Sequence, residues 1–168
     1  AREMAKTGAE VSLRWGATGV SPTNQIFRLG ADRLLFAANR NNPVETLTIS
    51  QANLLGRGLP GAWTTIFKES CPECQAPSAF LEQSPEVWKY PPGEDIALEM
   101  AEIPTIDKFA AAGRTWIAPT PRDLADAISN NPGAVGWLPA RWLNEDLKEI
   151  PLTGVNPLDT DIPVVAIT

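Results

Sequence analysis

Histidine is absent from this 168-residue chain, and cysteine occurs only twice. Without histidine the chain lacks the commonest proton shuttle at neutral pH and the commonest metal ligand. Two cysteines supply at most two thiolates, whereas a closed structural zinc site usually takes four ligands. The sequence therefore predicts no metal site and no cofactor. It favours a protein that binds rather than an enzyme, with carboxylate or thiol redox chemistry as the weaker alternative.

Long apolar runs and basic blocks are missing as well. No stretch is long and apolar enough to predict a membrane-spanning helix. The formal net charge of −6 and the absence of a basic block argue against nucleic acid or anionic lipid as the main partner. Apolar residues make up 43% and charged residues 20% of the chain, which is typical of a globular protein with a core. The length fits one domain, or two small lobes that share a hinge.

Both cysteines lie in one short motif, Cys71-Pro72-Glu73-Cys74, inside the proline-rich stretch 68–86. We interpret this stretch as an inserted surface loop that is longer than the usual connection. A thioredoxin-like redox pair is disfavoured because the motif lacks the strand-then-helix setting of such proteins. A local disulfide between Cys71 and Cys74, or a pair of free thiols, is the favoured interpretation.

Helical and strand patterns alternate along the chain. Thr48 and Gln51 form a capping-box pattern that predicts a helix from residue 49, and Thr120-Pro121 with Asp123 predicts a second helix start. A third helix is expected at 96–101. Short apolar or alternating runs predict strands at 11–15, 34–38, 87–90, 115–118, 134–138, 147–152 and 163–167. This alternation favours a layered α/β domain.

Tryptophan is abundant, with six residues in the chain. Trp63 follows Pro60-Gly61, and we interpret it as a core anchor beneath a loop. The other tryptophans lie at strand and turn positions, so packing is favoured over stacking on a sugar or a cation. Gly136 lies within a predicted buried strand, where glycine indicates a close backbone approach.

Three stretches share their order and spacing with one known family. Residues 42–63 combine Asn-Pro, a capped helix with a glutamine, a glycine and a tryptophan. Residues 87–100 hold a strand, a glycine-containing turn and a helix. Residues 130–137, Asn-Asn-Pro-Gly-Ala-Val-Gly-Trp, form the most specific match. Together they resemble the phosphate-type solute-binding proteins, which are the type II periplasmic binding proteins of bacterial uptake transporters.

The resemblance implies a periplasmic-binding-protein-like α/β fold with a mixed sheet flanked by helices. In that family two lobes are joined by crossing strands, and the ligand is held in the cleft between them. Applied to this chain, residues 1–30 are a remnant of the first lobe and the hinge, and residues 31–152 form the full second lobe. Residues 153–168 are expected to form a return strand to the hinge.

The expected ligand site is the turn Gly93-Glu94-Asp95-Ile96, at the start of a helix. In the family, a turn of small hydroxyl residues donates to an oxyanion at this place, where backbone N–H groups and the helix dipole favour an anion. Two carboxylates would instead repel phosphate by about 1 kcal/mol or more for each pair. A cationic or neutral polar ligand, or none, fits this turn better. The acids also fit a purely structural role at a helix N-terminus.

The opposite wall of the cleft is expected at the small polar loop that contains Thr18, Gly19 and Ser21. An ordinary turn is the alternative for these residues. We therefore predict a non-catalytic ligand-binding domain that acts outside the cytoplasm, although no signal peptide is visible in the chain. Its expected partners are a small polar ligand or an oxyanion, and a membrane transporter or another protein.

The rival prediction is a structural or protein-interaction domain on the same scaffold that has lost the anion site. A missing part of the first lobe would leave a sheet edge or an apolar face exposed. Self-association is expected under this alternative.

Overall fold

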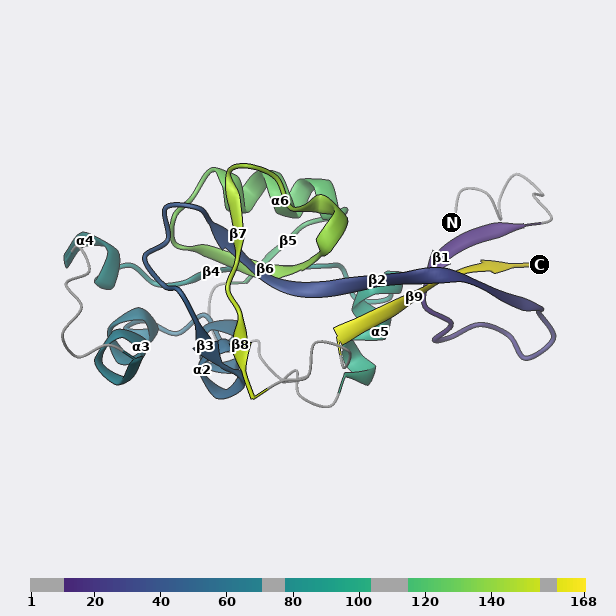
Figure 1. The fold of residues 1–168 in the computed structure, drawn as a ribbon, viewed down its shortest axis with the longest axis horizontal. Coiled ribbons are helices and arrows are strands. Elements are labelled where there is room, and N and C mark those ends of the chain that lie inside the picture. The colour runs from purple at the N-terminus through teal and green to yellow at the C-terminus, as the bar shows by residue number, and fades with distance from the viewer. Residues whose placement is uncertain (1–10, 71–77, 104–114, 155–159) are drawn as a thin grey trace.

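The computed structural model describes residues 11–70, 78–103, 115–154 and 160–168 (Figure 1). The strands are β1 (Ser12–Trp15), β2 (Ile26–Asn39), β3 (Leu47–Thr48), β4 (Glu86–Lys89), β5 (Thr115–Ile117), β6 (Ala134–Pro139), β7 (Leu147–Glu149), β8 (Leu152–Thr153) and β9 (Asp161–Ile167). The helices are α2 (Ile49–Gly56), α3 (Ala62–Ser70), α4 (Ser78–Leu81), α5 (Asp95–Glu102) and α6 (Pro121–Ser129), with a 3₁₀ turn η1 (Ala140–Trp142).

One mixed sheet of seven strands organises the described residues. Its order is β1-β9-β2-β6-β4-β5, and β7 also pairs with β2. The strands β4, β5 and β6 run parallel, whereas β2 runs antiparallel to β6, β7 and β9. A small parallel pair, β3 with β8, lies beside the main sheet. The observed fold is therefore the predicted mixed α/β arrangement.

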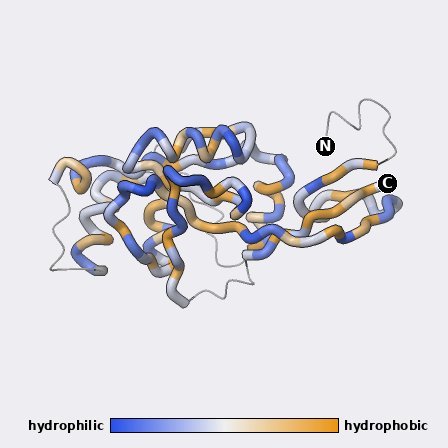
Figure 2. The backbone as a smooth tube through the Cα atoms, turned by 45° about the horizontal axis from the view of Figure 1, so that its top comes forward, coloured by the Kyte–Doolittle hydropathy of each residue, from blue (hydrophilic) through white to orange (hydrophobic). Residues whose placement is uncertain are grey.

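The strand β2 belongs to two parts of the molecule. Its first part, up to Arg33, pairs with β9, and its second part, from Leu34, pairs with β6. The strands β1 and β9 join the first part of β2 in an antiparallel ribbon that projects from the body (Figure 1). Hydropathy along the backbone shows apolar segments in the strands of this ribbon as well as in the body (Figure 2).

Alternation along β2 divides the core into two clusters. From Leu35 onward the side chains alternate: Leu35 and Ala37 lie in a cluster with the apolar side of α6, which also holds Leu34, whereas Phe36 and Ala38 lie in a cluster with α2 and α3. Since successive strand side chains point to opposite faces, one strand serves both clusters. The helices α6 and α2 accordingly lie on opposite sides of the sheet (Figure 1).

Two predicted helix starts are confirmed in atomic detail. The Thr48 hydroxyl accepts from the Gln51 amide at 3.2 Å, and the Gln51 side chain accepts from the Thr48 amide at 2.9 Å. Thr120 and Asp123 make the same reciprocal contacts at 3.2 and 3.1 Å. Each box satisfies two amide groups that a helix end would otherwise leave unpaired.

The prediction of a surface loop over residues 68–86 is wrong in part. The helix α3 continues to Ser70, and the short helix α4 buries Phe80. Residues 71–77, which include Cys71 and Cys74, lie outside the described residues, so the thiol predictions stay predictions. Trp63 itself does not lie in the predicted loop, because it lies in the first turn of α3. Pro60-Gly61 does form a turn, and α3 begins directly after it at Ala62.

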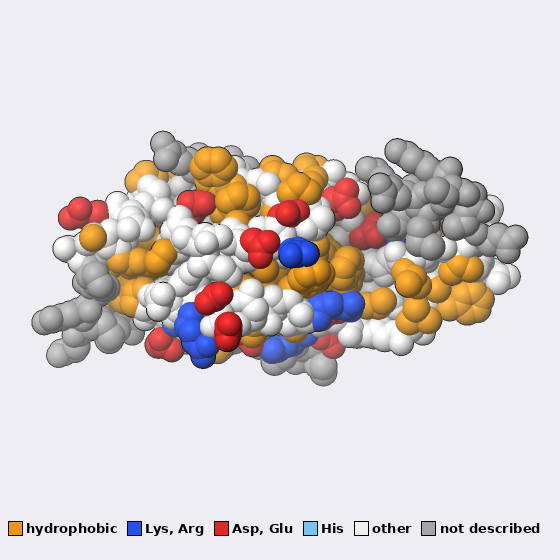
Figure 3. Space-filling model, turned by 90° about the horizontal axis from the view of Figure 1, so that it is seen from above, with side chains coloured by type: hydrophobic (Ala, Val, Ile, Leu, Met, Phe, Trp, Pro, Cys, Tyr) orange, Lys and Arg blue, Asp and Glu red, His pale blue; other side chains and the backbone are white. Residues whose placement is uncertain are grey.

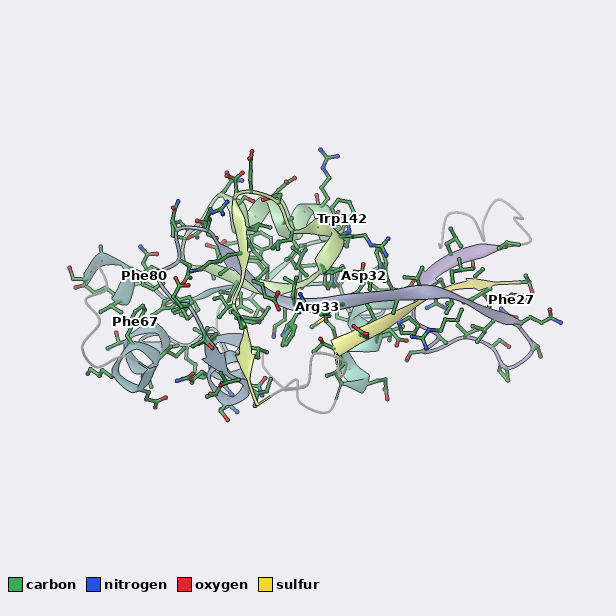
Figure 4. The ribbon with its side chains drawn as sticks, viewed as in Figure 1. Phe27, Asp32, Arg33, Phe67, Phe80 and Trp142 are labelled. Carbon is green, nitrogen blue, oxygen red and sulfur yellow. The ribbon has the colours of Figure 1, made fainter. Side chains whose placement is uncertain are left out.

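Trp63 is confirmed as a core residue. Its side chain is fully buried and lies 4.9 Å from the Phe80 ring, between centroids. Phe67 contacts the same Phe80 ring edge-on at 6.0 Å (Figure 4). These rings close the α3 and α4 end of the core.

Gly136 fills a position where the sheet and a helix leave no room for a side chain. A Cβ at this residue would lie 2.9 Å from the Trp88 carbonyl oxygen and 3.2 Å from Leu124. The close approach predicted from the sequence is therefore confirmed.

Candidate ligand site

A pocket of about 430 Å³ lies between the ribbon and the body. Its walls include residues 12–15 of β1 and the turn 93–96 that leads into α5. Gly19, Tyr90, Leu98, Pro119 and Pro121 complete the lining. The volume is within the range of about 300–1,000 Å³ that is usual for small-molecule sites.

The structure brings together most of the residues that the sequence singled out. Gly93, Glu94, Asp95 and Ile96 all line the pocket, and Gly19 lines it from the facing loop. Thr18 and Ser21 are not among the lining residues. The Thr18 amide instead donates to the Glu99 carboxylate at 2.8 Å, and the Ser21 hydroxyl is exposed beside the Thr23 hydroxyl at 2.8 Å. Thr18 and Ser21 therefore make hydrogen bonds within the fold and do not line the pocket.

The start of α5 offers backbone donors to the pocket. Gly93 has a positive φ of 88°, a conformation that glycine adopts without strain, and it turns the chain into the helix. Glu94 is the N-cap residue, but its side chain makes no capping hydrogen bond. Within the described part of the chain, the first amide groups of α5 therefore have no side-chain acceptor, and they carry the partial positive charge of a helix N-terminus.

Arg14 is the residue of the site that the sequence did not reveal. Its Nη2 and Nε atoms donate to Oδ1 of Asp95 at 2.6 and 2.9 Å, across 81 positions of sequence. Both side chains are about one-fifth exposed, at 19% and 21%. The ion pair offsets the charge of Asp95, so the turn is less acidic than its sequence indicates.

The loop after β1 is fixed against α5. A Cβ on Gly16 would collide with the side chain of Glu99, and Gly16 has a positive φ of 78°. Glu99 also accepts the hydrogen bond from Thr18. The hydrogen bond from Thr18 to Glu99 therefore fastens the loop after β1 to α5.

Two lining residues carry buried donors without acceptors. Among the described residues, neither the Tyr90 hydroxyl nor the Trp15 indole N–H has a hydrogen-bond partner. Burial, together with the charge of Asp32, raises the pKa of Tyr90 well above its usual range. The hydroxyl therefore stays protonated and remains a donor at neutral pH.

A charged group supports this end of the site from behind. Arg141 donates from Nε to Oδ2 of the buried Asp32 at 2.5 Å, and its guanidinium lies 5.4 Å from the centre of the Trp15 ring. Asp32 lies on β2 at the junction of ribbon and body (Figure 4). The contact with Arg141 fixes one face of the Trp15 indole by a cation–π interaction.

We expect Tyr90→Phe to leave the free energy of unfolding unchanged, or to raise it by up to about 1 kcal/mol, because an unsatisfied buried hydroxyl costs desolvation energy. Urea unfolding without ligand measures this effect. As a control, Thr120→Val removes a hydroxyl that does have a partner and should lose about 1 kcal/mol. A loss for Tyr90→Phe as large as that of the control would show that its hydroxyl has an acceptor.

Metal binding finds no support in this part of the molecule. Within residues 11–70, 78–103, 115–154 and 160–168, no group of three or more acidic or cysteine side chains is arranged to hold a metal ion. In the same ranges no helix is long and apolar enough to cross a membrane.

Solved structures with the same fold include transport and regulatory proteins. A phosphate ABC transporter substrate-binding protein with bound phosphate from Clostridium perfringens has a TM-score of 0.74 at 13% identity, covering 99% of this chain and 68% of that chain. An ABC-type phosphate transport receptor from Vibrio cholerae has a TM-score of 0.61 at 14% identity, with coverage of 98% and 69%. The reduced OxyR regulatory domain from Pseudomonas aeruginosa has a TM-score of 0.55 at 10% identity, with coverage of 99% and 66%.

At the level of sequence, no family model and no curated protein matches the chain. The structural likeness establishes that the chain has the fold of the periplasmic binding proteins, with a mixed sheet flanked by helices. The similar structures are binding proteins and regulatory domains, and fold alone does not decide between those two roles.

Proposed function

We propose that this chain is a non-catalytic ligand-binding domain that holds a small polar ligand in the pocket between β1 and α5. One observation carries the proposal. The pocket joins an uncapped helix N-terminus, the Arg14–Asp95 ion pair and two lining residues with unpartnered buried donors. Unsatisfied polar groups beside a cavity mark a place where a ligand's polar atoms would be stabilised.

The charge around the pocket favours a ligand that is not strongly anionic. Glu94 and Asp95 line it, and Glu99 lies beside it on α5, whereas Arg14 is the one cationic side chain among the described lining residues. The excess of negative charge disfavours phosphate, although the similar structures include a protein with bound phosphate. A neutral, zwitterionic or cationic polar ligand is preferred.

An uptake role places the domain outside the cytoplasm beside a membrane transporter. The similarity to transport receptors supports this role, and the similarity to regulatory domains supports a sensing role in its place. In both roles, we propose that the described parts of residues 11–30 and 153–168 belong to the ribbon side of the cleft, and the described parts of residues 31–152 belong to the body. The same pocket would hold the ligand.

A thermal-shift screen tests the binding function. Amino acids, polyamines, sugars, phosphate and sulfate are each added to the purified chain. A ligand at about 100 times its Kd adds about 2.7 kcal/mol to the free energy of unfolding, which raises Tm by about 5–10 °C. The shift should shrink in Asp95→Ala and persist in Asp126→Ala, which removes an exposed acid on α6. A hit that survives Asp95→Ala unchanged would place the site elsewhere.

An interaction domain is the second candidate, and a patch on the ribbon favours it. Leu13, Phe27 and Leu29 are 56%, 51% and 60% exposed, and Val11 and Ile26 are more than two-fifths exposed. Figure 3 shows apolar side chains gathered at this end of the molecule. Exposed apolar patches commonly mark contact surfaces. A chain that sediments as a dimer or larger, with no hit in the screen, would favour this candidate.

A further inference from the structure

We infer that the pocket selects a small dipolar ligand, in which an acidic group and an ammonium group lie on neighbouring atoms, as in an α-amino acid. This inference rests on the proposed function and names the ligand class for the same site. It follows from the way the pocket pairs opposite charges.

The Arg14–Asp95 pair places a cation and an anion in direct contact on the pocket wall. Among the described residues, the side-chain hydrogen bonds of the pair end on Oδ1 of Asp95 and on the Thr18 carbonyl oxygen. Among the described residues, Nη1 of Arg14 and Oδ2 of Asp95 make no hydrogen bond. Each partner therefore keeps one free polar atom, a donor on Arg14 and an acceptor on Asp95.

The donors around the pocket define where an acid group would bind. The uncapped amides of α5 and the free Nη1 of Arg14 are donors on residues that line the pocket. A carboxylate accepts from several such donors at once, and charge-assisted hydrogen bonds are stronger than neutral ones.

The acceptors define where an ammonium group would bind. Oδ2 of Asp95 is free, and Glu94 is an exposed lining residue whose side chain has no hydrogen-bond partner among the described residues. Glu99 is committed to the Thr18 amide and is left out of this set. Since these carboxylates adjoin the donors, the ligand's own opposite charges must be close together.

Ligands that carry charge of only one sign fit this wall of the pocket less well. A dianion such as phosphate gains the donors but meets Glu94 and Asp95 at close range. A simple amine gains the carboxylates but leaves the helix amides and Arg14 without a new acceptor. A zwitterion satisfies both sets and adds no net charge to the pocket.

Isothermal titration calorimetry with the whole chain tests the inference. The probes are the common L-α-amino acids and inorganic phosphate, and each amino acid that binds is followed by two matched analogues. One analogue lacks the carboxylate and the other lacks the amine. We expect at least one amino acid to bind, and both of its analogues to bind about ten- to a hundredfold more weakly.

Charge-neutralising variants assign the effect to the ion pair. Arg14→Gln and Asp95→Asn should each weaken the amino acid about tenfold or more. Arg33→Gln is the matched control, because Arg33 pairs with Glu149 at 2.8 Å on β7, outside the pocket. The control should bind as the natural chain does. Urea unfolding of every variant separates lost binding from lost folding.

The possible failures are distinguishable. If phosphate or a singly charged analogue binds as tightly as the amino acid, the dipolar class is wrong while ligand binding at the pocket stands. If no amino acid binds but another polar probe of the thermal-shift screen does, the dipolar class is again wrong and the proposed binding function still stands. If no probe of any class binds, both the inference and the proposed function are overturned.

Discussion

Trp63→Ala should lower the free energy of unfolding by about 3–5 kcal/mol, the range for truncating a fully buried aromatic residue. The side chain is 0% exposed and packs on Phe80, so no solvent is positioned to fill the space that it leaves. The expected loss combines the lost transfer energy of the ring with the cavity that remains. Urea unfolding followed by far-ultraviolet circular dichroism measures it.

Trp116→Ala is the matched control for this prediction. Trp116 lies on the edge strand β5, is 47% exposed and stacks on Trp88 at 5.8 Å. Removing it should cost less than about 1.5 kcal/mol, the worth of an aromatic pair. Equal losses for the two variants would contradict the placement of Trp63 in the core. Trp63→Phe should cost less than Trp63→Ala, because the phenyl ring still fills much of the space that the indole occupies.

Gly136→Ala should destabilise the fold by about 1–3 kcal/mol, the usual cost of overpacking a filled core. The added Cβ would meet the Trp88 carbonyl oxygen at 2.9 Å. That atom belongs to the backbone of β4, which pairs with β6 at this residue, so it moves only if the sheet moves. The added Cβ would also lie 3.2 Å from the Leu124 side chain of α6, so the residue has no room to move away from β4. Chemical denaturation measures the loss.

Gly30→Ala provides the comparison. Gly30 also lies in a strand, but a Cβ there would have no heavy atom within 4 Å and its φ is not positive. Its replacement should change the free energy of unfolding by less than about 1 kcal/mol and can raise it by restricting the unfolded chain. If Gly136→Ala is as mild as this control, the contact with the Trp88 carbonyl does not constrain the sheet.

Local signals in the sequence predicted those elements whose ends are chemically marked. Both capping boxes were found because the side chains that stabilise each helix start are only three residues apart. The first part of β2 was missed because Arg28, Gly30, Asp32 and Arg33 interrupt its apolar pattern. This part lies in the ribbon, where side chains face solvent, and alternation fades when neither face is fully buried.

The sequence predicted the turn of the candidate site but not the arginine that pairs with it. The turn 93–96 was found because it precedes a helix at the place where the family resemblance puts a ligand. Arg14 was missed because its partner Asp95 lies on an element that only the folded sheet brings near. No pattern in β1 distinguishes Arg14 from an exposed strand residue. Its ion pair also changes the chemistry expected of the turn, from doubly acidic to dipolar.

The position of β2 in the sheet has a consequence for the order in which the chain can fold. Its partner strands among the described residues, β6, β7 and β9, all begin at Ala134 or later. During synthesis β2 therefore emerges long before any strand that can pair with it. Closing such long loops is entropically costly and slows the formation of non-local contacts. The sheet is completed only once the C-terminal strands exist, so truncation before β9 leaves the ribbon part of β2 without its partner.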